Sequence, residues 1–118
     1  MDYMLLVIEN AAERRARSVD VGYGLMERMN RFNEDLKARG ICKASDSLGP
    51  DARGVRIEAR GGKPVVSDGP FTEAKEIVGG FFLLSCESRE QALAIARECP
   101  AAEWATVELR EVGPCHGG

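Results

Sequence analysis

The chain is poor in the residues that metal sites and nucleophilic enzymes use. It has a single histidine, His116, and four cysteines that form no Cys-x-x-Cys pair. Cys115 and His116 are too few to bind zinc, which needs about three or four ligands at fixed spacing. Cys42 has no identifiable base to activate its thiol. We therefore expect no metal and no cofactor.

The chain also lacks a strong charge of one sign and a long hydrophobic run. Its net charge is -3 at pH 7 and its pI is about 5.2, whereas nucleic-acid binding requires a concentrated basic face. The one basic cluster, Arg14, Arg15 and Arg17, is interpreted as a solvated loop or first turn. No apolar run approaches the roughly 20 residues that span a bilayer, and no basic leader opens the chain. We expect no membrane contact and a cytoplasmic protein with reduced cysteines.

Two segments, Tyr3–Ile8 and Phe81–Cys86, are apolar at every position or nearly so, which predicts strands covered on both faces and central in a sheet. Ile41–Leu48 is a weaker strand, and Trp104–Val112 alternates as a last strand. Val55–Arg60, Gly61-Gly62 and Lys63–Ser67 form a clear hairpin pattern, expected at an edge of the sheet.

Helical periodicity appears in two places. An apolar stripe from Val21 to Leu36 predicts a long helix, with Asp20 as its N-cap and residues 10–20 before it as a loop. Ser88, with Gln91 three residues later, begins a second helix. Residues 72–76 are interpreted as a short charged helix that follows a turn at Asp68.

The resulting order predicts an α+β fold: a ferredoxin-like β-α-β-β-α-β domain over residues 1–112 with an inserted β-hairpin, followed by a flexible tail over 113–118. Such a sheet carries both helices on one face. Its other face would be apolar here, and a bare apolar face is unusual on a soluble monomer. We therefore expect a homodimer that forms through the open sheet face.

Asp68-Gly69-Pro70-Phe71, followed by Thr72-Glu73-Ala74-Lys75-Glu76, resembles the motif of the DGPF family, a branch of the YCII-related proteins. The resemblance continues through Gly79-Gly80-Phe81-Phe82. It implies a dimeric α/β barrel of ferredoxin-like type. A related branch includes a lyase-like enzyme with a histidine–aspartate pair. This chain lacks an early-helix histidine, so that mechanism does not transfer.

The motif has a structural and a functional interpretation. Structurally, Asp68 accepts hydrogen bonds from its own turn and Phe71 anchors the core. Functionally, Asp68 is a general base or a hydrogen-bond acceptor for substrate, and Lys75 binds an anion at the mouth of the pocket. The remaining candidate ligand-binding residues are Glu73, Tyr3, Ser45 and Arg56, with Asp46 beside them.

Three functions follow as hypotheses. The first is a homodimeric protein that binds an unknown small molecule or serves as an accessory protein. The second is a lyase or isomerase acting on a small oxygenated or aromatic metabolite with Asp68 as base. The third, implied by the resemblance alone, is a regulatory partner of an extracytoplasmic-function sigma factor. Whether the chain is an enzyme stays open at this point.

Overall fold

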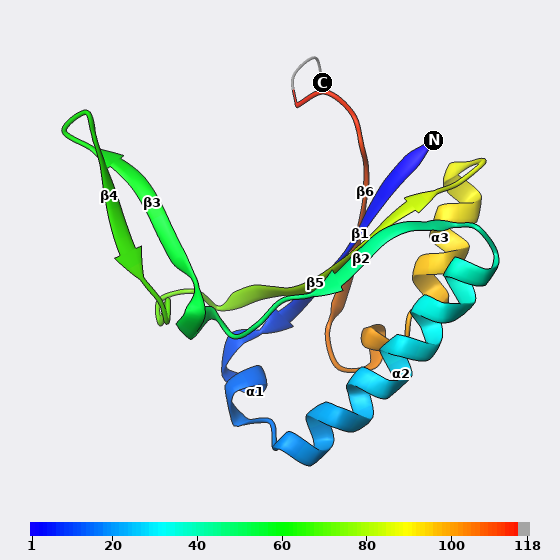
Figure 1. Ribbon diagram of the computed structural model, residues 1–118, viewed down its shortest axis with the longest axis horizontal. Coiled ribbons are helices and arrows are strands. Elements are labelled where there is room, and N and C mark those ends of the chain that lie inside the picture. The colour runs from blue at the N-terminus through cyan, green and yellow to red at the C-terminus, as the bar shows by residue number, and fades with distance from the viewer. Residues whose placement is uncertain (116–118) are drawn as a thin grey trace.

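The structure, a computed structural model, describes residues 1–115. Its elements run in the order β1 (Asp2–Asn10), α1 (Ala11–Ala16), α2 (Val19–Ala38), β2 (Cys42–Ser47), η1 (Asp51–Arg53), β3 (Val55–Arg60), β4 (Lys63–Asp68), β5 (Glu76–Ser85), α3 (Arg89–Glu98), η2 (Pro100–Glu103) and β6 (Thr106–Glu111) (Figure 1). This mixture of helices and antiparallel sheet confirms the predicted α+β class.

Four strands form one antiparallel sheet in the order β2-β5-β1-β6. The two doubly apolar segments are therefore its central strands, as predicted. Leu5 lies opposite Phe82 and Tyr3 opposite Leu84, and all four side chains are buried on the face that carries the helices. The period of two along β1 thus sends every second side chain into the core.

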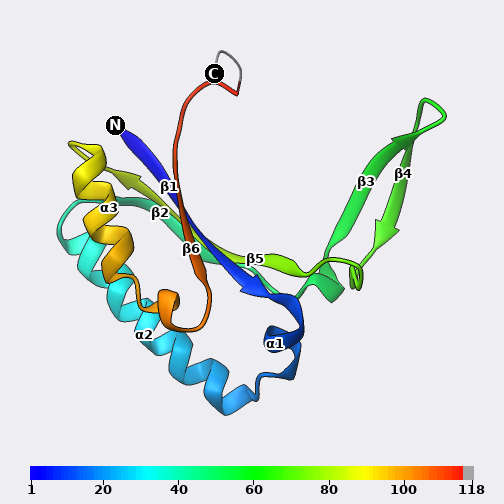
Figure 2. The same cartoon turned by 180° about the vertical axis from the view of Figure 1, so that it is seen from behind.

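The long helix α2 packs on this face through its second half only. Leu36 is fully buried, and the Phe32 ring meets the Phe82 ring edge-to-face with centroids 5.4 Å apart. No residue of α2 before Phe32 is buried. The first half of the helix therefore stands away from the sheet, and Figures 1 and 2 show it reaching out beyond the strands.

Residues 10–20 are not the loop that we predicted. Asn10 caps α1 by accepting a hydrogen bond from the Glu13 backbone N–H at 2.9 Å. The cap of α2 is Ser18, which accepts from the Val21 N–H at 3.2 Å, and not Asp20. The prediction was wrong because α1 is six residues long and buries Ala11 alone, which is too little to display a helical period.

The predicted hairpin is present as β3 and β4, joined by Gly61 and Gly62 at φ 58° and 79°. We call it the arm. We expected it at an edge of the main sheet, but it is a separate two-stranded sheet that projects from the body (Figure 1). Val55, Ile57 and Val66 on its apolar side are more than half exposed. The alternation that suggested a half-covered edge strand is compatible with a free-standing hairpin as well.

The second face of the main sheet is also apolar. Met4 lies opposite Leu83 and Leu6 opposite Phe81, and these side chains are partly exposed. Both long helices lie on the other side of the sheet (Figure 2). Within the described residues, no helix covers this open face.

Candidate functional site

A cavity of about 440 Å³ lies between the first half of α2 and the helix-bearing face of the sheet. Pockets for small molecules typically measure about 300–1,000 Å³. The apolar part of its wall comes from α2, the central strands and the segment before β6, through Val7, Leu25, Met29, Phe82 and Trp104. The cavity exists because α2 leaves the sheet before Phe32.

Glu9 is the buried charge of this cavity, with 6% of its surface exposed. Arg17 Nη1 donates a hydrogen bond to Glu9 Oε1 at 2.9 Å, and Arg14 Nη1 lies 3.1 Å from Glu9 Oε2. Each arginine side chain keeps 19% of its surface exposed. A buried carboxylate requires such partners, because removing a charge from water costs several kcal/mol. Glu9 thus holds two guanidinium groups at one end of the cavity.

The glycine pair before the central aromatic residues makes room for this carboxylate. A Cβ atom on Gly79 would lie 2.3 Å from Glu9 Oε2. The pairing of β1 with β5 shifts at the same place, between Val7 and Ile8. Gly79-Gly80 is therefore a packing requirement of the cavity, in addition to part of a strand.

Arg14 has further donors in the same place. Its Nη2 donates to the Leu48 backbone oxygen at 2.6 Å, which ties α1 to the end of β2. Its Nη1 is shielded from solvent and, although close to Glu9, has no N–H aligned on an acceptor in the described residues. Buried donors are nearly always paired. Arg14, a residue of the cavity wall, therefore has one buried donor without an aligned acceptor.

A second polar group lies at the α2–β2 side. Ser45 Oγ donates to Asn33 Oδ1 at 2.7 Å, and Cys42 Sγ lies 3.5 Å from the same oxygen. Ser45 and Asn33 both line the cavity. The cavity thus has apolar walls with two polar ends, a combination that orients small ligands.

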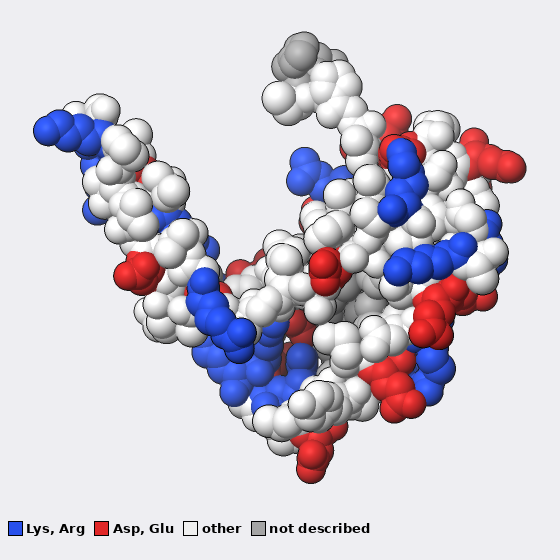
Figure 3. Space-filling view, in the orientation of Figure 1, with Lys and Arg blue, Asp and Glu red and all other residues white. Residues whose placement is uncertain are grey.

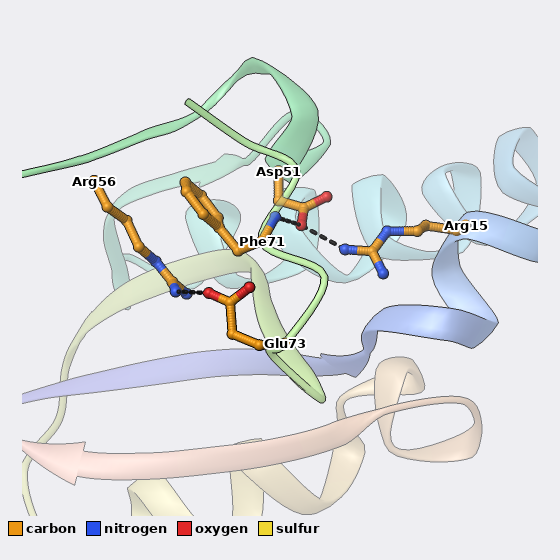
Figure 4. Close-up of polar contacts among 5 residues, drawn as sticks. All are labelled: Arg15, Asp51, Arg56, Phe71 and Glu73. Carbon is orange, nitrogen blue, oxygen red and sulfur yellow. Dashed lines mark hydrogen bonds and ion pairs between the residues drawn. The ribbon is translucent and has the colours of Figure 1, made fainter. Parts of the chain in front are cut away.

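The Asp-Gly-Pro-Phe segment forms a different cluster, at the base of the arm (Figure 4). The Asp51 carboxylate accepts from the Phe71 backbone N–H at 3.1 Å and from Arg15 Nη2 at 2.6 Å. The Phe71 hydrogen bond, followed by Arg15, holds the pKa of Asp51 below its ordinary value against the opposing effect of burial. Asp51 therefore fills the turn-capping role that we predicted for Asp68.

The packing at the arm base explains two other motif residues. A Cβ atom on Gly69 would lie 1.8 Å from the Asp51 backbone oxygen, so no side chain fits there. The Arg56 guanidinium lies 4.0 Å from the centre of the Phe71 ring and pairs with Glu73 at 3.2 Å. Phe71 is thus a partner of the arm, and it lies outside the main core cluster. The motif joins the arm to the body.

Most of the predicted site residues lie away from the cavity. Asp68 and Lys75 are exposed, Asp68 at the end of β4 and Lys75 just before β5. Glu73 and Arg56 pair with each other at the arm base, and Tyr3 is fully buried in the core. Ser45 lines the cavity, and so does Asp46.

The short helix predicted over 72–76 is absent. The chain makes a turn in which the Ala74 N–H bonds to the Phe71 oxygen at 3.0 Å, and β5 begins at Glu76. That prediction was wrong because charge near an assumed helix start is weak support without an apolar period. His116 lies outside the described residues.

The residues that sequence reasoning missed are Glu9, Arg14 and Arg17. One signal was present: in β1 the inward positions are Tyr3, Leu5 and Val7, and the next in register is Glu9. A charge on the inward face of a central strand requires a partner. The neighbouring arginines, interpreted as solvated, are those partners.

Two of the cysteines are buried. Cys86 and Cys99 are free, and burial raises the pKa of both thiols. No helix in the described part of the chain is both long and apolar enough to cross a membrane.

Two comparisons with known proteins bear on this site. The model of the YCII-related domain matches residues 1–116. The chain is also 42% identical over 88 residues to an uncharacterised protein of Rhizobium meliloti (strain 1021), a stretch that covers 68% of this chain and 70% of that relative.

Proposed function

The chain belongs to the YCII-related family, and on that premise we propose that it binds a small molecule in the cavity beneath α2. The observation that carries the proposal is the position of Glu9, Arg14 and Arg17 at one end of a cavity whose walls are largely apolar. Such a combination of apolar walls and a few convergent polar groups is the usual form of a ligand site.

Binding is supported better than base catalysis by Asp68. Asp68 is exposed on the arm and is not among the residues that line the cavity. The lyase or isomerase hypothesis and the sigma-factor hypothesis stay predictions from sequence. The four free cysteines favour a reducing, cytoplasmic location as part of the proposal.

A cavity-filling variant tests the proposal. Met26 lines the cavity, whereas Tyr23 on the same helix does not line it and is 72% exposed. Ligand-observed NMR with a library of small organic acids, amides and alcohols should find binders of the wild type. Met26→Trp should lose them, and Tyr23→Trp should keep them. Binders that survive Met26→Trp unchanged would place the site elsewhere.

We also propose that the protein is a homodimer of the dimeric α/β barrel type, within the DGPF branch. The strand order β2-β5-β1-β6 supports a ferredoxin-like domain, and the Asp68–Glu76 segment supports the branch. The apolar open face of Leu6, Phe81 and Leu83 supplies the surface for a second copy. Because the cavity lies on the opposite face, a dimer formed in this way leaves it accessible.

Leu6→Glu tests the dimer, with Tyr23→Glu as a matched control on the exposed side of α2. Sedimentation velocity should give a dimer for the wild type and for Tyr23→Glu, and a monomer for Leu6→Glu. A monomeric wild type at micromolar concentration would refute the dimer and leave the cavity proposal untouched.

A further inference from the structure

Resting on the proposed binding function, we propose that the ligand is a small organic monoanion, a carboxylate or similar acid with an apolar body. Its charged group would bind Arg14 and Arg17 beside Glu9, and its body would lie against the apolar wall formed by Met29, Phe82 and Trp104.

The charge balance of the cavity points to an anion. Four charged residues line it: Glu9, Arg14, Arg17 and Asp46. Asp46 lies opposite Phe81 on β5, so its side chain belongs to the open face, and its carboxylate accepts from the neighbouring Ser47 N–H at 3.0 Å. Two guanidinium groups and one carboxylate remain inside, which leaves one net positive charge. A single negative charge on the ligand would neutralise it.

The hydrogen-bonding capacity points the same way. A guanidinium group carries five N–H donors, so two of them offer more than one carboxylate accepts. In addition, Arg14 Nη1 is shielded from water with no aligned acceptor in the described residues. An incoming carboxylate would accept from the exposed N–H groups of the two guanidinium groups and would form charge-assisted hydrogen bonds, which are about twice as strong as neutral ones.

The same geometry disfavours a dianion. Glu9 is fixed beside both arginines at 3.1 and 2.9 Å, so any ligand anion binds close to an existing negative charge. A phosphate monoester would bring two charges against one net positive charge. We therefore expect carboxylates to bind more tightly than phosphates of the same shape.

Three probes of one shape test this assignment: cyclohexanecarboxylate, its neutral amide, and cyclohexyl phosphate. Trp104 lies in the cavity wall and is the sole tryptophan, so its fluorescence reports binding of these non-absorbing probes. We expect the carboxylate to bind at least about tenfold more tightly than either other probe, a difference of about 1.4 kcal/mol.

Neighbouring arginines supply the variants. Arg17→Gln removes a partner of Glu9, and Arg15→Gln removes the arginine that faces Asp51 at the arm base. Arg17→Gln should weaken binding of the carboxylate about tenfold and leave binding of the amide unchanged. Arg15→Gln should change the affinity for neither probe. Circular dichroism confirms that each variant is folded. If Arg17→Gln fails to fold, Arg17→Lys replaces it, with the carboxylate again expected to weaken and the amide to stay.

Two other outcomes would contradict the proposals. Equal binding of carboxylate and amide, or tighter binding of the phosphate, would overturn the monoanion assignment while the cavity proposal stands. An unchanged Trp104 signal with all three probes at millimolar concentration would overturn this inference, whereas the proposed function is decided by the library and Met26→Trp.

Discussion

The cavity and the arm base each contain a carboxylate paired with arginine in or next to α1, but the two places differ in accessibility and packing. In the cavity, Glu9 is nearly inaccessible and faces Arg14 and Arg17 beside a space large enough for a ligand. At the arm base, Asp51 faces Arg15 and the backbone of Phe71 (Figure 4). Gly69 packs directly against the Asp51 backbone.

Three arginines that are close in sequence, Arg14, Arg15 and Arg17, contribute to two different sites. Arg14 lies in α1 and Arg17 is the extended residue that follows the helix, and both face Glu9, whereas Arg15 faces Asp51. Figure 3 shows the basic side chains gathered around α1 and the foot of the arm. The charge pattern alone looks like a solvated cluster, and the pairing partners, Glu9 and Asp51, distinguish its members.

The largest predicted effect breaks the arm base. Gly69→Ala forces a Cβ atom into the Asp51 backbone oxygen, and backbone gives way less easily than a side-chain end. We expect a loss of about 3 kcal/mol in the free energy of unfolding, measured by urea denaturation. Gly113→Ala is the control, because its Cβ would meet open space. Equal stability of the two variants would contradict the packing described here.

The next effect disrupts the cavity. Glu9→Gln leaves Arg14 and Arg17 without a counter-charge while both are largely buried. We expect a loss of about 2 kcal/mol in stability by denaturant titration, because breaking a buried charged pair is costly even when one end retains access to water. Glu73→Gln, whose exposed pair with Arg56 is screened by solvent, should change stability much less.

A smaller effect depends on pH. The pKa of Asp51 is lowered in the folded protein from an ordinary value of 3.8. Its charge therefore stabilises the fold above pH 3.8, and this contribution is lost as the pH falls through the lower folded value. Asp51→Asn should thus be less stable than the wild type at neutral pH.

The difference between wild type and Asp51→Asn should shrink as the solution is acidified. Thermal unfolding of both proteins across this range measures it. The pKa of Glu103 is also lowered, by Arg28, but this effect is present in both proteins and cancels in the comparison. A difference that grows toward acid would give the wrong sign for the Asp51 interaction.

The smallest effect concerns Arg15, the more exposed partner in the ion pair with Asp51 at the arm base. The Arg15 side chain is 39% exposed, so Arg15→Gln should reduce stability by only about 0.5 kcal/mol. Its value lies in the contrast with Arg17→Gln, which should change ligand affinity. Calorimetric unfolding of both variants measures their stability, so that an effect at the arm base is distinguished from an effect at the cavity.

The parts of the fold that could be predicted from the sequence are those with a clear local pattern of apolar and polar residues. The doubly apolar β1 and β5, the Gly61-Gly62 hairpin and the Ser88 cap all follow from local patterns, and each is present in the structure. The helix α1 was missed because one buried alanine leaves no period. The arm was placed at a sheet edge because alternation does not specify what a strand pairs with.

The site was harder to predict for a different reason. Asp68 drew attention because it begins a recognisable motif, whereas Glu9 meets Arg14 and Arg17 through α1, a helix that the sequence did not predict. The capping of Phe71 by Asp51 joins residues twenty positions apart. The only sign of a buried charge in the sequence is its position in the alternation of a strand. Glu9 shows this sign, because it continues the buried positions of β1.

The most direct measurement is a crystal structure of the wild type soaked with cyclohexanecarboxylate. The account predicts density for the ligand beneath α2, with its carboxylate within hydrogen-bonding distance of the Arg14 and Arg17 guanidinium groups and its ring against Trp104. An empty cavity, with the ligand instead beside Asp68 or on the arm, would contradict it.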